Sequence, residues 1–151
     1  MRIRASALAG ACLAAAVGGC GGDDGVSKSD YVKKGNAICH NYDNQVAALA
    51  KRSFPNIAQS NQRPTVPAFQ AFLGKLLPLT EDELRKLRAL ERPKGDEKEI
   101  EAIWAAADRG VAQARRGATD PAVARRLMGQ VDPFAEANRK AKAYGLKTCG
   151  S

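Results

Sequence analysis

The chain has 151 residues, of which 44% are hydrophobic, and its 24 Lys and Arg against 16 Asp and Glu give a net charge of +8. This length predicts one domain with a real hydrophobic core and excludes an array of several domains. Beyond Cys20 no apolar run approaches the roughly 20 residues that a membrane-spanning helix needs, so we expect no transmembrane segment there.

The N-terminus has the layout of an export signal. A basic tetrapeptide, MRIR, precedes an uncharged segment from Ala5 to Val17. This segment is shorter than a membrane span but matches the apolar region of a secretory signal peptide. We therefore predict that residues 1–19 are a signal peptide. An ordinary secretory signal that is cleaved after Ala16 is the alternative, because the segment also contains an A-x-A site.

A cysteine follows this signal. The tetrapeptide VGGC, residues 17–20, resembles the lipobox of bacterial lipoproteins, with Val where Leu is usual and Gly at the next position. The resemblance implies a diacylglyceryl group on the Cys20 thiol, cleavage before this residue by signal peptidase II, and a lipid anchor on the extracytoplasmic face of the cell membrane. Residues 20–28 have almost nothing to bury, so we expect a lipidated flexible tether before a helical domain formed by residues 29–151.

The first predicted helix covers residues 30–52. Its apolar residues recur at spacings of three and four, which indicates one buried face of an amphipathic helix. Ser27 or Ser29 can cap the start of this helix.

A second apolar stripe extends from Pro67 to Leu90. Pro78 lies inside this stripe and lacks the backbone N–H that a helix interior needs, so we predict a kink or a break there. The segment TEDE, residues 80–83, has the form of a capping box, which would restart the helix at that point.

Two further helical segments complete the pattern. The third is predicted from Asp96 to Gly117, and the fourth starts at an Asp-Pro pair, residues 120–121, by the cap-then-proline rule. A second Asp-Pro pair at residues 132–133 predicts a kink or a division into two helices, and the Gly-Leu pair at residues 145–146 resembles a Schellman stop. No period-two strand pattern occurs. The predicted fold is all-α, an antiparallel four-helix bundle with proline-interrupted second and fourth helices.

The chain has four cysteines. Cys12 leaves with the signal peptide and Cys20 carries the lipid, so Cys39 and Cys149 remain as an even pair in an oxidising compartment. In an up-and-down bundle the end of the fourth helix lies beside the start of the first. We predict a Cys39–Cys149 disulfide that stabilises the fold by up to about 4.7 kcal/mol in the loop-entropy model. Two unpaired buried thiols are the alternative.

The positive charge is concentrated in the C-terminal third. Loss of Arg2 and Arg4 with the signal leaves 22 of the 24 basic residues, and from Arg109 onward 9 basic residues face 3 acidic ones. Such a surface can bind anionic lipid head groups or phosphorylated wall polymers, whereas a solvated face with some ion pairs is the alternative. The candidate residues are Arg115, Arg116, Arg125, Arg126, Arg139, Lys140 and Lys142.

The sequence offers few groups for catalysis or metal binding. Its only histidine, His40, adjoins Cys39, but neighbouring helical residues point about 100° apart and cannot form a nucleophilic pair. A single histidine cannot supply a di-iron site, and the thiols are already assigned. Haem between His40 and Met128 is disfavoured because the two residues differ by roughly 9 Å in height along the bundle. We therefore predict no cofactor and no metal.

The acidic residues also have a structural explanation. Residues 81–83 and 96–101 fall in the first turns of predicted helices, where negative charge offsets the helix dipole. We therefore predict no acid–base catalysis, and a protein that is not an enzyme.

Two motifs at the ends of the predicted domain are shared with a known group. With the lipobox, the segments DYVKKGNAIC, residues 30–39, and AYGLKTCG, residues 143–150, resemble small exported lipoproteins of unknown function from high-GC Gram-positive bacteria. The resemblance implies the location and the Cys39–Cys149 pairing, and it brings no catalytic residues.

Together these patterns predict a membrane-anchored extracytoplasmic binding module. Its expected partner is an envelope protein or an anionic envelope component such as lipid head groups or wall polymers, and the compartment argues against nucleic acid. One alternative is a small envelope hydrolase, which would need a deep pocket with convergent carboxylates. The other is a small-ligand carrier, in which the interruptions at Pro78 and Pro133 splay the helices around a cavity.

Overall fold

The computed structural model describes residues 25–55, 63–129 and 131–150. The predicted signal peptide and Cys20 lie outside these residues. Within the described part the fold is all-α, as predicted, and none of its helices is both long and apolar enough to cross a membrane. The elements are α1 (Lys28–Ser53), α2 (Val66–Arg88), α3 (Glu97–Thr119), α4 (Pro121–Met128), α5 (Ala135–Tyr144) and the short 3₁₀ helix η1 (Thr148–Gly150).

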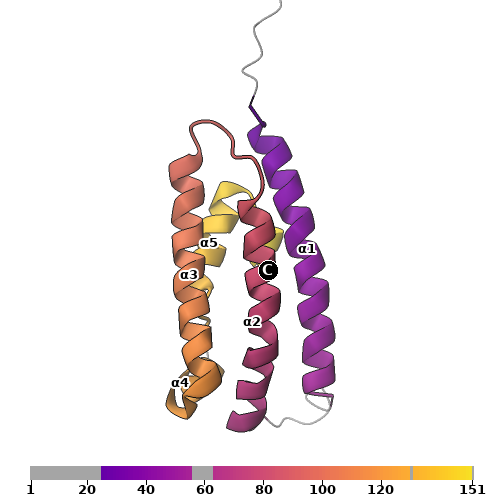
Figure 1. Cartoon of the computed structure of the whole chain (residues 1–151), viewed down its shortest axis with the longest axis vertical. Helices are drawn as coiled ribbons and strands as arrows, with labels where there is room; N and C mark the ends of the chain where they lie inside the picture. Colours follow the sequence, from indigo (N-terminus) through magenta and orange to yellow (C-terminus); the bar gives the residue numbers. More distant parts are fainter. Residues whose placement is uncertain (1–24, 56–62, 130, 151) are drawn as a thin grey trace, which may run out of the picture.

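The helices form a bundle in which α1, α2 and α3 lie side by side and alternate in direction (Figure 1). Helix α4 packs against α2 and α3 at the end of the molecule opposite the start of α1, and α5 returns along α3. We call the end that holds the start of α1 the tether-proximal end, after the tether predicted from the sequence, and the end that holds α4 the distal end. The predicted fourth helix is thus divided into α4 and α5, one of the two outcomes that the second Asp-Pro pair predicts.

Side chains and turn geometry set the helix ends largely as predicted. The Ser27 hydroxyl accepts a hydrogen bond from the Asp30 N–H at 3.0 Å and caps α1. The Asp120 carboxylate caps α4 by accepting from the N–H of Ala122 at 2.7 Å. At the end of α5, Gly145 adopts φ 118°, and the Leu146 N–H donates to the Ala141 carbonyl at 2.9 Å. This is the predicted Schellman geometry.

The predicted restart of the second helix at residues 80–83 is wrong, because α2 continues through Pro78 without a break. Thr80 does not cap a helix. Its hydroxyl donates to the Leu76 carbonyl at 3.2 Å and is hydrogen bonded to the Tyr42 hydroxyl at 2.8 Å. The carbonyl that Pro78 leaves without a donor belongs to Gly74, which is exposed and can be hydrated.

The predicted end of the third helix at Gly117 is also wrong, because α3 continues to Thr119. Gly117 is buried, and a Cβ atom there would lie 2.6 Å from Leu127 and 3.0 Å from Leu73. The glycine therefore permits close approach of α2 and α4 to α3 and does not end a helix.

The largest fully buried side chains of the core lie toward the tether-proximal end. Tyr31 packs edge-on against Tyr144 with ring centroids 5.9 Å apart. A Cβ atom on Gly35 would lie 2.5 Å from the Leu146 side chain. These large, fully buried side chains are those of Tyr31, Cys39, Leu87, Ile100 and Leu146.

Candidate functional site

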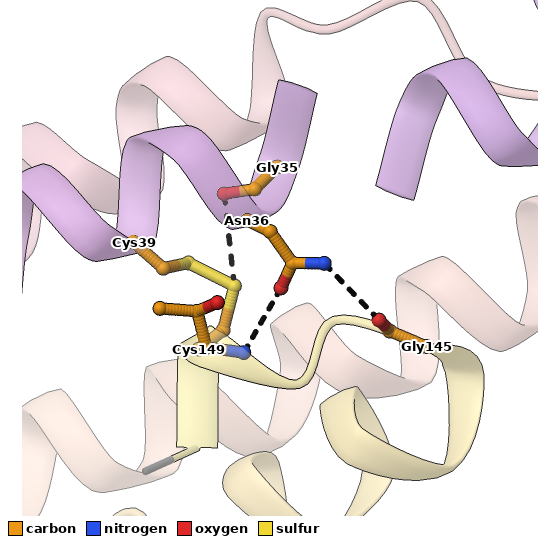
Figure 2. The surroundings of a disulfide bond; sticks show 6 residues. Gly35, Asn36, Cys39, Gly145 and Cys149 are labelled. Atoms are coloured by element: carbon orange, nitrogen blue, oxygen red, sulfur yellow. Dashed lines mark hydrogen bonds between the residues drawn. A yellow bond between two sulfur atoms is a disulfide. The ribbon is translucent and has the colours of Figure 1, made fainter. Parts of the chain in front are cut away.

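The predicted disulfide is confirmed and joins the two ends of the domain (Figure 2). Cys39 of α1 and Cys149 of η1 are 110 residues apart in sequence, and their Cα atoms are 4.9 Å apart. The Asn36 amide reinforces this junction, since it donates to the Gly145 carbonyl at 3.2 Å and accepts from the Thr148 N–H at 2.9 Å. The C-terminal segment is therefore fixed against α1.

Cys149 also borders a cavity of about 150 Å³ inside the bundle. Its walls come from α1, α2, α3, α5 and the connection between α4 and α5. The apolar lining is formed by Leu84, Leu87, Ile103, Trp104, Ala107, Phe134, Ala137 and Ala141. The polar lining is formed by Tyr42, Asp43, Thr80, Glu83, Asp132 and Asn138.

Glu83 is an acidic residue of this cavity whose pKa is raised. Its side chain makes no hydrogen bond and no ion pair within the described part of the chain, although it is half-buried. Burial, and to a smaller extent the nearby charge of Asp43, raise the pKa of Glu83 to about 8. Asp132 differs, because its carboxylate accepts hydrogen bonds from the Phe134 N–H at 2.8 Å and from the Asn138 amide at 3.4 Å. Glu83 is thus a carboxyl group that lacks a cation.

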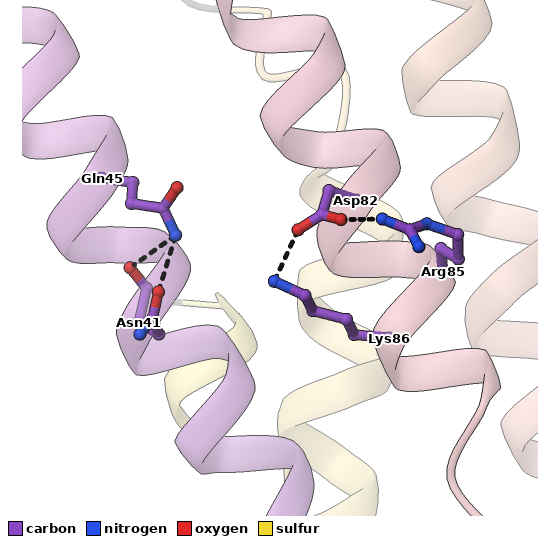
Figure 3. A network of polar contacts seen from close by, with 5 residues as sticks. All are labelled: Asn41, Gln45, Asp82, Arg85 and Lys86. Carbon is purple, nitrogen blue, oxygen red and sulfur yellow. Dashed lines mark hydrogen bonds and ion pairs between the residues drawn. The ribbon is translucent and has the colours of Figure 1, made fainter.

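Tyr42 and Glu83 line a second hollow as well, the groove on the outer surface between α1 and α2. Figure 3 shows polar side chains on both sides of this groove. Gln45 donates to the Asn41 side chain at 2.6 Å within α1, and Asp82 pairs with Arg85 and Lys86 within α2. Each of these contacts stays within one helix, whereas the hydrogen bond between Tyr42 of α1 and Thr80 of α2 at 2.8 Å links the two helices.

Trp104 forms part of the cavity wall on α3. It is 3% exposed, and its Nε1–H is buried without a hydrogen-bond partner in the described residues. A buried donor without a partner costs about 1–3 kcal/mol. Most such groups in folded proteins are satisfied, so this one is a feature that needs an explanation.

The predicted anion-binding residues form two groups in the structure. One consists of Arg115 on α3 with the three residues on α5, and the other consists of Arg116, Arg125 and Arg126 at the distal end. Arg115 pairs with Glu81 at 2.6 Å, and Lys140 pairs with Glu136 at 3.8 Å. Arg139, Lys140 and Lys142 lie on α5. Arg116, in the last turn of α3, and Arg125 and Arg126, on α4, lie at the distal end, are exposed, and make no ion pair with any described residue.

A groove beside these arginines is lined by apolar side chains and by one acidic residue, Asp132. This distal groove has a volume of about 400 Å³ and lies between α2, α4 and the start of the α4–α5 connection. Phe72 stacks on Phe69 with ring centroids 6.3 Å apart, and Val131 is 49% exposed. The residues that project from the two sides are Phe69, Phe72, Leu76, Met128 and Val131. Apolar side chains and unpaired arginines therefore share the distal end.

Sequence reasoning placed residues 81–83 in the first turn of a restarted helix, and this interpretation is wrong because they lie inside α2. Glu81 pairs with Arg115 across the surface, whereas Glu83 lines the cavity. One signal was present in the sequence, since Thr80 follows Leu76 by four residues and therefore continues the apolar stripe of α2. A polar residue on such a stripe indicates an internal polar site.

His40 is exposed, and its Nε2 is 3.3 Å from the Asn44 amide. In the described part of the chain, no group of three or more His, Cys, Asp or Glu side chains is placed to hold a metal ion.

Comparison with known proteins gives no match, since no protein-family model, no curated protein and no solved structure is significantly similar to this chain. The function is therefore argued from the geometry of the chain's own residues.

Proposed function

We propose that this protein is a non-catalytic binding domain, anchored to the extracytoplasmic face of the membrane through Cys20 like the small exported lipoproteins that it resembles. Its binding surface is the distal groove together with Arg125 and Arg126. In this proposal α4 and α5 together take the place of the fourth helix of an antiparallel bundle, and the gap between them opens the groove.

The observation that carries the proposal is the combination of an apolar groove and unpaired arginines at one end of the molecule. Exposed apolar patches rimmed by polar groups mark interaction sites. Since the arginines on α4 have no carboxylate partner among the described residues, an acidic partner would supply the missing charges. The partner that fits best is an acidic amphipathic segment of an envelope protein, whose apolar face fills the groove.

Chain length supports a partner other than the anchoring membrane. The 26 residues of α1 span about 39 Å at 1.5 Å per residue. The chain between Cys20 and Lys28 reaches at most about 29 Å when fully extended. A domain anchored through Cys20 therefore cannot invert and press its distal end onto the same membrane. Lipid head groups of the anchoring membrane could reach the distal groove only if the domain lay on its side, whereas a protein partner can reach it in an upright domain.

An envelope hydrolase is the second candidate, and the cavity favours it, because Asp43 and Glu83 converge there with Glu83 tuned to a pKa of about 8. A carboxyl group with a raised pKa beside a second carboxyl group can serve acid–base catalysis. We rank it second because a hydrolase of this kind must hold a water molecule and the substrate together, whereas the cavity has a volume of only about 150 Å³.

Site-specific photo-cross-linking in living cells of the native host tests the proposal. A photoreactive amino acid replaces Val131 in the distal groove or Lys98, an exposed residue in the first turn of α3 at the tether-proximal end. We expect one recurrent envelope protein from position 131 and none from position 98. The Arg125→Glu/Arg126→Glu variant should lose the product, and the Arg115→Glu variant should retain it.

Three outcomes would contradict the proposal. These are equal products from both positions, a product that survives the double charge reversal, and cross-links from position 131 to lipid or wall polymer only. The Cys20→Ser chain completes the design, because loss of the product in this variant would show that capture depends on the anchor.

A further inference from the structure

The internal cavity carries an inference that goes beyond the distal groove. We infer that it binds a small organic cation with an aromatic body, whose ammonium group lies at the carboxyl groups of Asp43 and Glu83 and whose ring lies against Trp104 and Phe134. A ligand of this class supplies what the cavity wall lacks.

The first argument is charge. Carboxyl groups of Asp43, Glu83 and Asp132 line the cavity, and the described lining contains no Lys, Arg or His side chain. Glu83 lies on the wall without any hydrogen bond or ion pair to a described residue. A buried carboxylate without a cation is unfavourable. A ligand ammonium group would pair with it in surroundings where the interaction is poorly screened.

The second argument is the shape and chemistry of the interior. A cavity of 150 Å³ with apolar walls accepts a benzene ring, and this cavity has about that volume. Trp104 and Phe134 offer aromatic surfaces for stacking with the ring and for attraction of the cation. The unpartnered Nε1–H of Trp104 is a separate sign of a missing group, because the face of an aromatic ligand can accept this hydrogen.

The third argument is a route to the surface. Tyr42 and Glu83 line both the internal cavity and the groove between α1 and α2. The polar contacts on the flanks of that groove stay within their own helices (Figure 3). The hydrogen bond between Tyr42 of α1 and Thr80 of α2 links the two helices at this place, so it has to open before the ring can enter past Tyr42 and Glu83. The ammonium group then remains beside the carboxyl groups at the mouth.

Titration of the full chain with its disulfide intact tests this inference. Trp104 is the only tryptophan of the chain and lines the cavity, so its fluorescence reports occupancy, and calorimetry gives the affinity. The probes are benzylamine, its neutral analogue benzyl alcohol, and the anion benzoate. We expect saturable binding of benzylamine, at least tenfold weaker binding of benzyl alcohol, and no binding of benzoate.

Two variants distinguish the effect of the carboxyl charge on binding from the effect of the cavity itself. Glu83→Gln keeps the size of the side chain. We expect it to lower the affinity for benzylamine at least tenfold and to leave the affinity for benzyl alcohol unchanged. Retained binding of benzyl alcohol by this variant shows that the cavity is still formed. Glu81→Gln is the matched control, because Glu81 pairs with Arg115 outside the cavity, and we expect no change in either affinity.

The inference is overturned by any of three results. One is the absence of saturable benzylamine binding to the wild-type chain. Another is equal binding of benzylamine and benzyl alcohol, which would mean that the carboxyl groups do not select a cation. The third is an unchanged benzylamine affinity in the Glu83→Gln variant.

Discussion

The two ends of this bundle are built from the same kinds of residue but are packed differently. Toward the tether-proximal end the chain is cross-linked, and side chains such as Leu146 are fully buried. At the distal end Val131 is half exposed and the arginines of α4 are unpaired. A domain that needed only stability would gain by covering such exposed apolar side chains. In our proposal, one end fixes the fold and the other binds.

Removal of the disulfide should have the largest effect on stability. In the Cys39→Ala/Cys149→Ala variant the unfolded chain is no longer restricted by a loop of this length, and we expect a loss of about 4–5 kcal/mol in the free energy of unfolding. Urea denaturation at pH 7 measures it, with reduction of the wild-type protein as the parallel treatment. A loss under about 1 kcal/mol would contradict the role assigned to the junction of α1 and η1.

Truncation of one apolar side chain at each end compares the packing directly. Leu146 is 0% exposed and packs on Gly35, so Leu146→Ala should cost about 3 kcal/mol. Met128 lies on the wall of the distal groove, and Met128→Ala should cost under about 1 kcal/mol. Urea denaturation of both variants measures the difference, and equal losses would mean that the distal groove is part of the core.

The pH dependence of stability tests the burial of Glu83. Its pKa is raised from 4.5 to about 8 in the folded protein, so between these values the folded state holds a proton that the unfolded state has released. This contribution to stability therefore falls as the pH rises from about 5 to about 8. Glu83→Gln removes the dependence and should be more stable than wild type at pH 8.5, by about 2 kcal/mol after allowance for solvent screening.

At pH 4.5 the advantage of the Glu83→Gln variant should be almost gone, since the wild-type carboxyl group is then protonated in the folded state and half protonated in the unfolded state. The Glu81→Gln variant should show no comparable gain at pH 8.5. A wild-type stability that rises steadily from pH 5 to pH 8, unchanged in slope by Glu83→Gln, would show that this group is not buried as described.

The surface ion pairs should contribute least to the free energy of unfolding. Arg115 and Glu81 lie 2.6 Å apart across α2 and α3, but both are largely exposed. Arg115→Ala should therefore lower the free energy of unfolding by less than about 1 kcal/mol. Denaturation at low and high salt measures this effect. A larger loss would mean that pairs between the two helices help to hold the bundle together.

Local chemistry made several parts of this structure predictable from the sequence. Helix caps such as Ser27 and Asp120 act within a few residues, and the stop at Gly145 depends on backbone geometry alone. The partners Cys39 and Cys149 could be predicted because few cysteines remain after the lipobox is assigned.

The parts that could not be predicted depend on contacts between distant segments. Thr80 could cap a helix or face the core, and its hydrogen bond to Tyr42, 38 residues away in sequence, decides between them. Gly117 resembles a helix end until Leu127 packs against it. The cavity has the same origin, because no local pattern shows that Asp43 and Glu83 will face one space.

The orientation of the domain on the membrane tests the proposed division between an anchoring end and a binding end. The full chain, isolated with its lipid and reconstituted in vesicles that carry a head-group quencher, would bear a fluorescent amino acid at position 98 or at position 131. We predict strong quenching at position 98 and little at position 131, and loss of both signals in the Cys20→Ser chain. Quenching at position 131 equal to that at position 98, or signals that persist without Cys20, would contradict the proposed arrangement.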